Sequence, residues 1–307
     1  MIAWLLTEQI SVLFLMMACG FALVKKKLIR TEESKTLSII SIYLVIPCVI
    51  INAFQVDYSD EIRDGFLLAL FAAVVIHGIL FAVCAIFGKI LKLEAVEKAS
   101  LIYSNAGNLI IPLVAAVLGT EWEIYASAFL CVQQIAIWTH GQSLMSRKSG
   151  VNWRKIWSNI NLIAIAVGIC LFFAQIKLPS VLGDAVSSLS SMIGPISMVM
   201  IGMLLASVEW KSIFIQKRIY LIVFLKMIVF PGIILLFLRF LGQSVSVANA
   251  QTILLISLLA VITPSATTVT QLAQLYDRNA PYASAINVFT TIVCIVTMPL
   301  MVMLYTL

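Results

Sequence analysis

Two short stretches decide the fold: residues 104–112 read Ser-Asn-Ala-Gly-Asn-Leu-Ile-Ile-Pro, and residues 262–268 read Ile-Thr-Pro-Ser-Ala-Thr-Thr. Each lies near the middle of a long apolar run. Proline removes a backbone N–H donor and clashes with the preceding helical turn, and Asn and Gly are poor helix formers. An unwound backbone within a bilayer is tolerated only beside protein or a wet cavity. The two stretches therefore predict two broken transmembrane helices at a central site.

The composition around these stretches is that of a membrane protein. The 307 residues are 62% hydrophobic and 11% charged, with a mean hydropathy of +1.08, whereas a soluble domain carries about 25% charged residues. A bilayer core about 30 Å thick needs about 20 apolar residues per helix. We therefore expect an all-α polytopic membrane protein, with the first apolar run retained as a span because it lacks a basic start and a cleavage pattern. The ten predicted spans are residues 3–24, 36–56, 64–88, 99–118, 123–145, 157–174, 181–208, 218–241, 248–275 and 280–305.

The basic residues indicate how the chain is oriented. Of the 20 Lys and Arg residues, 16 fall in loops after odd-numbered spans and three in loops after even-numbered spans. Cytoplasmic loops carry an excess of Lys and Arg. We therefore expect an integral protein of the cell (plasma or inner) membrane with both termini outside. The net charge of +6 arises from these loops, so it does not indicate nucleic-acid binding.

The two halves of the chain resemble one another. Pro47 and Pro195 are 148 residues apart, Pro112 and Pro264 are 152 apart, and the tetrapeptide Tyr-Ala-Ser-Ala at residues 125–128 recurs 157 residues later. These intervals predict a five-span repeat at residues 1–150 and a second at residues 151–307. Because five is odd, the second repeat must be inverted, which is the architecture that supports alternating access in transporters.

The broken spans also carry the predicted substrate site. A helix N-terminus offers free N–H groups and a partial positive charge, which suits a carboxylate. We expect hydrogen bonds to the substrate from Asn108, Gln134 and Thr267 in particular. The other interpretation is that the two prolines are ordinary kinks. The predicted substrate-binding residues are Asn105, Gly107, Asn108, Pro112, Gln133, Gln134, Thr263, Pro264, Ser265, Thr267, Thr268 and Asn287.

Two ionisable residues lie deep within spans. An intramembrane cation is costly and marks a functional-site candidate, so Lys226 is a candidate for compensating substrate charge or for coupling. The alternative is that Lys226 snorkels to the cytoplasmic face. His77 is the second candidate, because histidine can change its charge near neutral pH, but we favour a neutral, hydrogen-bonded packing histidine at this position. All 14 acidic residues lie in loops or near span ends, which leaves no midplane carboxylate for a proton relay.

Enzymatic chemistry finds no support in the sequence. There is no HExxH motif, no midplane aspartate pair and no Ser/His/Asp arrangement. The six cysteines lie inside apolar runs without a CxxC pair, which is typical of packing residues and not of a metal or disulfide site. We therefore predict no catalytic residue, no metal and no cofactor.

With these residues in view, the chain resembles the auxin efflux carrier family of the bile acid/auxin transporter superfamily, as a compact bacterial-type member. Residues 105–112 and 263–265 look like the family's two crossovers, Gln133 to Trp138 is similar to a Gln-then-Trp pattern of span 5, and Lys226 with Pro231 to a basic-then-proline pattern. The resemblance implies a carrier of small organic anions, such as malonate, malate or auxin-like acids. It also implies a scaffold of spans 1, 2, 6 and 7, a transport domain of spans 3–5 and 8–10, and a homodimer.

Three alternatives remain open at this point. The second crossover lacks the glutamate that sodium-coupled bile acid carriers place there, so a symporter of that type would have to bind sodium through neutral oxygens. An anion channel would show single-channel currents in place of saturable rates with trans-stimulation. A metabolite sensor would bind an anion without moving it.

Overall fold

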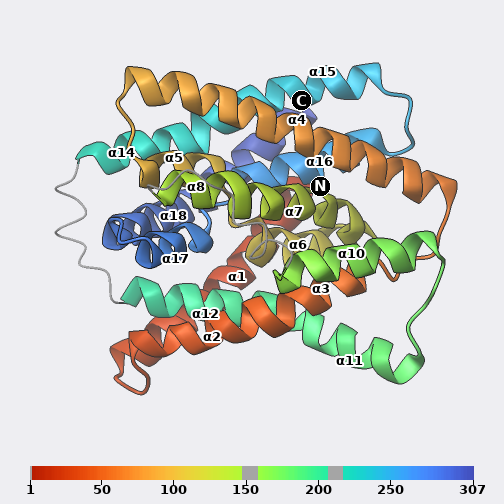
Figure 1. The fold of residues 1–307 in the computed structure, drawn as a ribbon, viewed down its shortest axis with the longest axis horizontal. Coiled ribbons are helices and arrows are strands. Elements are labelled where there is room, and N and C mark those ends of the chain that lie inside the picture. The colour runs from red at the N-terminus through yellow and green to blue at the C-terminus, as the bar shows by residue number, and fades with distance from the viewer. Residues whose placement is uncertain (1, 147–157, 207–216) are drawn as a thin grey trace.

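The computed structural model describes residues 2–146, 158–206 and 217–307, and every regular element in those ranges is a helix (Figure 1). The predicted boundary between the repeats, at residues 150 and 151, lies outside the described residues. So do five of the predicted cytoplasmic basic residues: Arg147, Lys148, Arg154, Lys155 and Lys211. The elements of the first half are α1 (Ile2–Lys25), η1 (Thr31–Glu33), α2 (Ser34–Ile40), η2 (Ser41–Val45), α3 (Ile46–Ala53), α4 (Asp60–Ile90), α5 (Ala95–Ile102), α6 (Ala106–Val117), η3 (Thr120–Trp122), α7 (Glu123–Ala136), η4 (Ile137–Gly141) and α8 (Gln142–Met145). Those of the second half are α10 (Ile160–Phe173), α11 (Ser180–Ser191), α12 (Ile193–Ala206), α14 (Lys217–Phe224), η5 (Leu225–Val229), α15 (Phe230–Ser244), α16 (Ala250–Ile262), α17 (Thr267–Leu275) and α18 (Ala280–Thr306).

Five continuous helical segments of the described chain are long and apolar enough to cross a membrane. Each coincides with a predicted span. Predicted spans 1 and 5 correspond to the continuous helical segments Ile2–Lys25 and 123–145, and the remaining three correspond to helices that are shorter or interrupted. The total of ten spans stays a prediction. The five segments are Thr31–Ala53, Asp60–Ile90, Ser180–Ala206, Lys217–Ser244 and Ala280–Thr306.

Wide π-helical turns precede two of the prolines. The turn η2 leads into α3, whose second residue is Pro47, and η5 leads into α15, whose second residue is Pro231. A proline ring clashes with the carbonyl four residues earlier in a regular helix. A π-turn makes room for the ring, so both segments pass a proline without ending.

The helices pack as two groups. The smaller group comprises α1, α2, α3, α10, α11 and α12, in which α1 lies along α12, and α3 contacts both α10 and α11. The larger group comprises α4 to α8 and α14 to α18, in which α4 contacts α7 and α16. Figure 1 shows α2 and α12 side by side along one edge of the molecule, with α4 and α15 along the opposite edge.

Glycine brings α1 and α12 together. A Cβ added at Gly20 would overlap the backbone of Val199, and one added at Gly202 would overlap the backbone of Met17. Helices in lipid associate through such small-residue contacts because the hydrophobic effect between them is weak. The two glycines therefore allow the close contact between α1 and α12 within the smaller group.

Candidate functional site

The two helix breaks lie against one another. Between α5 and α6, and between α16 and α17, the backbone is extended, and Ser104 pairs with Ser265 in an antiparallel bridge. The Asn105 N–H donates to Pro264 O over 2.8 Å, and the Ala266 N–H donates to Tyr103 O over 3.0 Å. Each break thus satisfies backbone groups of the other, which is what permits non-helical chain in the centre of a membrane protein.

The two prolines act differently at these breaks. Thr263 has extended dihedrals directly before Pro264, the conformation that a following proline favours, so Pro264 ends α16. The expectation that Pro112 also marks a break is wrong, because Pro112 lies within α6 and the chain unwinds at Tyr103 to Asn105. The break is placed by its pairing with the second half of the chain, and Pro112 instead leaves the Asn108 carbonyl without its helical donor.

Side chains from neighbouring helices hold both breaks. Gln133 of α7 donates from Nε2 to Ser104 O over 2.8 Å and accepts from the Ser104 N–H at Oε1 over 3.0 Å. In the second half, Thr290 Oγ1 accepts from the Ser265 N–H over 3.1 Å, and Asn287 Nδ2 donates to Ser265 O. Gln133 and Thr290 are separated by the same interval as Tyr125 and Tyr282, so the two clamps occupy equivalent places in the repeats.

Lys226 lies beside the first break. Its side chain is buried, with 1% exposed, and Nζ donates to Ser104 Oγ over 2.7 Å and to Leu101 O over 3.3 Å. None of the ion pairs in the described part of the chain includes Lys226. The ammonium sits at the C-terminus of α5, where unpaired carbonyls carry a partial negative charge. Lys226 therefore does not snorkel, and it places a cation without a carboxylate partner next to the paired breaks.

A cavity separates the two groups of helices at the N-terminus of α17. Its wider part has a volume of about 700 Å³. A narrow part of about 40 Å³ adjoins it and shares Ser38, Met200, Thr267 and Gln271 with it. Glu32 and Lys35 lie at the wide end, whereas the narrow part has no charged lining residue. Gln271 Nε2 donates to Ser38 Oγ over 2.7 Å across the gap between α17 and α2.

Four of the predicted site residues line this cavity: Gln134, Thr267, Thr268 and Asn287. Others are buried in the paired breaks or hold them, which makes them positioning residues: Asn105, Gln133, Thr263, Pro264 and Ser265. Gly107 lies in the first turn of α6 and faces Leu130. Asn108 and Pro112 belong to α6, but their side chains lie outside what the structure describes.

The cavity also has lining residues that sequence reasoning missed. Ser41 of η2 and Asn161 of α10 are both buried, and Ser41 Oγ and Asn161 Oδ1 have no hydrogen-bond partner among the described residues. Both come from the smaller group and face Gln134 and Thr267 of the larger group. A buried polar atom without a partner calls for an explanation, and beside a cavity a bound ligand or water would supply one. The sequence signal was weak, because a single Ser or Asn is common in a membrane helix.

His77 has the environment of a packing residue. Its Nδ1 lies 2.8 Å from Ala73 O, one turn earlier in α4, and its ring centroid is 4.9 Å from that of Phe129. It lines neither part of the cavity. The geometry favours the packing interpretation over a coupling role.

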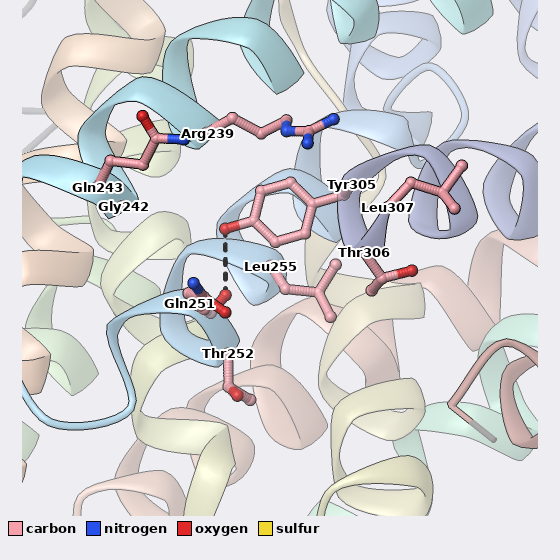
Figure 2. Close-up of a pocket in the computed structure, with 9 residues that line it drawn as sticks. All are labelled: Arg239, Gly242, Gln243, Gln251, Thr252, Leu255, Tyr305, Thr306 and Leu307. Atoms are coloured by element: carbon pink, nitrogen blue, oxygen red, sulfur yellow. Dashed lines mark hydrogen bonds between the residues drawn. The ribbon is translucent and has the colours of Figure 1, made fainter.

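A second pocket of about 310 Å³ lies between α15, α16 and the end of α18 (Figure 2). There Tyr305 Oη donates to Gln251 O over 3.2 Å, and Arg239 Nη1 donates to Leu304 O over 3.2 Å. It contains none of the predicted site residues and shares no lining residue with the cavity at the breaks. It is therefore a useful control location.

Comparison with known protein families identifies the family of this chain. The model of one family, described as membrane transport protein, matches the chain twice, over residues 5–151 and 147–302. The two matches fall on the two predicted halves and together cover nearly the whole chain. The comparison with curated proteins found no match. The chain therefore belongs to this family of membrane transport proteins, which confirms the family that its crossover residues resemble.

Proposed function

We propose that this protein is a secondary transporter of small organic anions that works by alternating access. The substrate binds in the narrow cavity at the N-terminus of α17, between the two groups of helices. The smaller group serves as the scaffold, and the larger group moves with the bound anion. The wide end of the cavity, at Thr31 to Lys35, faces the cytoplasm, as the loop charges predict.

The observation that carries this proposal is the chemistry of the cavity at the first turn of α17. Thr267 and Thr268 line it in the first turn of α17, where the helix dipole places a partial positive charge. Ser41, Gln134 and Asn161 add neutral polar groups from facing helices. Neutral donors with a helix N-terminus are a set that binds a carboxylate. The buried ammonium of Lys226 beside the paired breaks adds an attraction for negative charge.

The proposal is tested by ligand-dependent thermal stability of the purified protein. The panel contains mono- and dicarboxylates, indole acids and bile salts, each with and without sodium. A ligand that binds the folded state raises the melting temperature in a saturable way. We expect small carboxylates to do so without sodium. Stabilisation by bile salts only with sodium would instead support a sodium-coupled symporter.

Two matched variants test whether the stabilising anion binds in the cavity at the breaks. Gln134→Leu removes a cavity amide and should abolish stabilisation by the active carboxylate. Gln243→Leu makes the same change in the pocket of Figure 2 and should leave it intact. An equal effect of both variants, or silence with every anion, would contradict an anion site in this cavity.

A further inference from the structure

A buried carboxyl lies at the end of the molecule opposite the cavity mouth. Glu123 is the first residue of α7 and is only 5% exposed. It forms a side-chain hydrogen bond with Asn52, near the end of α3. Its Oε2 has no hydrogen-bond partner among the described residues, and none of their ion pairs includes it.

This contact joins the two groups of helices. Asn52 belongs to the smaller group and Glu123 to the larger one, and around them η3 and α7 pack against α3, while α7 also packs against α10. Two aromatic rings of the smaller group pack against each other nearby, with the centroids of Phe54 and Phe172 6.4 Å apart. On this side of the molecule the two groups are therefore in contact.

The inverted repeat shows what the same positions do on the other side. Counting by the interval between Pro47 and Pro195, Asn52 corresponds to Met200. Counting by the interval between Tyr125 and Tyr282, Glu123 corresponds to Ala280. Met200 and Ala280 both line the wide part of the cavity. Equivalent positions thus touch at one end of the molecule and border an open space at the other, as expected of a carrier open to one side only.

We propose that Glu123 and Asn52 form the outer gate of this carrier, and that the gate closes on the protonated carboxyl and opens when Glu123 loses its proton. The proposal rests on the alternating-access function above. In the closed gate, an ionised Glu123 would bury a charge with one oxygen unpaired, which is costly. With the gate open, the carboxylate is hydrated and ionises freely. Alkaline solution therefore favours the open outer gate.

Within the described ranges, no cation forms an ion pair with Glu123. Among the elements packed against α7, neither α6 nor α16 has an ionisable side chain, and α3 and α10 have only the thiols of Cys48 and Cys170. At the outer end of α4, Arg63 is paired with Asp60 and Asp64, and Lys177 is paired with Asp57. The remaining ionisable groups on α7 and its neighbours are Glu61, His77, Cys84 and Lys89 of α4, Glu121 of η3, Tyr125 and Cys131 of α7, and His140 of η4.

The test follows access to the opposite side of the carrier and needs no substrate. In a background without the six native cysteines, Ser284→Cys places one thiol in the wide cavity. Its rate of modification by a bulky maleimide in detergent solution reports the share of molecules open at that side. Glu123→Gln mimics the protonated gate, so at pH 5 this variant and the Ser284→Cys parent should react at equal rates. At pH 8 the parent should react about threefold or more slowly than Glu123→Gln, because its outer gate opens.

Matched variants test whether the pH dependence comes from the contact between Glu123 and Asn52. Glu121→Gln removes the exposed carboxylate two residues earlier and should behave as the parent, whereas Glu123→Asp should keep the pH dependence. Asn52→Leu removes the partner and should lower the rate at both pH values, which provides a test should Glu123→Gln not fold. Equal rates for the parent and Glu123→Gln from pH 5 to 8, or the same effect from Glu121→Gln, would overturn the gate. Because no ligand is used, failure of every anion to bind would leave this result standing.

Discussion

Gln133 and Ser104 are joined by two hydrogen bonds, one in each direction, between the side-chain amide and the backbone of a single residue. The Gln133 amide thus bonds both the N–H and the C=O of Ser104, which have no helical partners at the break. An equivalent polar clamp holds Ser265 in the second half. Side-chain hydrogen bonds therefore hold both central breaks, and the proposed anion would be bound by residues beside the clamps.

Neighbouring glutamines should consequently differ in their roles. Gln133→Leu leaves the Ser104 N–H and C=O buried without partners, and we expect a loss of about 2–4 kcal/mol in the free energy of unfolding. Gln134 lines the cavity, so Gln134→Leu should reduce anion binding and leave stability nearly unchanged. Thermal melts with and without the active carboxylate measure both effects. Equal destabilisation by the two variants would contradict the assignment.

Lys226 should matter for the charge of the substrate more than for the fold. Lys226→Met keeps the length of the apolar stem and removes a buried charge, a change that often leaves stability unaltered or improved. We expect carboxylate affinity to fall about tenfold or more, because an unpaired cation in a low-dielectric interior attracts an anion strongly. Titration of the melting temperature with the active anion tests this. Unchanged affinity in a folded Lys226→Met protein would show that Lys226 only caps α5.

Asn161 should contribute to anion binding and not to the stability of the fold. Its Oδ1 is buried without a partner among the described residues and borders the narrow cavity. Asn161→Leu should therefore weaken anion binding without lowering the melting temperature. The matched control is Asn159→Ala, because Asn159 Oδ1 caps α10 by accepting from the N–H groups of Asn161 and Leu162. That control should cost about 1 kcal/mol and leave binding intact. Loss of stability without loss of binding in Asn161→Leu would refute a ligand role.

Glu97 should make stability depend on acid pH. It is buried and accepts from Arg218 Nη2 over 2.8 Å and from Tyr282 Oη over 2.9 Å, linking α5, α14 and α18. Burial raises the pKa of Glu97, but hydrogen bonds from Arg218, the Glu94 backbone and Tyr282 outweigh it and hold the pKa below its usual value.

A depressed pKa in the folded state contributes stability above the unfolded pKa of about 4.3, and this stability is lost as pH falls through the folded pKa. The melting temperature should therefore fall on acidification to pH 3 more steeply in the native protein than in Glu97→Gln. The less stable Glu97→Gln serves as the pH-insensitive reference at this site, and Glu121→Gln should keep the native slope. Parallel curves for all three proteins would exclude Glu97 as the source.

The close approach of α1 and α12 should not tolerate a methyl group. Gly202→Ala must push the backbones apart, so we expect a large loss of folded protein and a lower melting temperature. Gly78→Ala is the control, because an added Cβ there meets nothing within 4 Å and alanine favours the helix by about 1 kcal/mol. The yield and melting temperature of both variants decide the matter. A native-like Gly202→Ala protein would show that the two helices are not tightly packed.

Local properties of the chain determined the membrane class, the helical segments and the approximate places where two helices break. Hydropathy averaged over a span and the backbone restrictions of Asn, Gly and Pro act over a few residues, and so they can be read without a partner. The intervals between Pro47 and Pro195 and between Tyr125 and Tyr282 likewise predict two similar halves. The model of one transport family matches the chain twice, and the boundary between the halves stays a prediction.

The tertiary structure alone decided which polar groups are used by the fold and which line the cavity. The sequence could not distinguish Gln133 from Gln134, because one turns toward Ser104 and the other toward the cavity only once α7 is packed. Nor could it place the first break at Tyr103 to Asn105, since that break is held by residues of the other half, about 160 positions away. Hydrogen bonds between distant segments depend on how helices approach in space, and no local pattern encodes that approach.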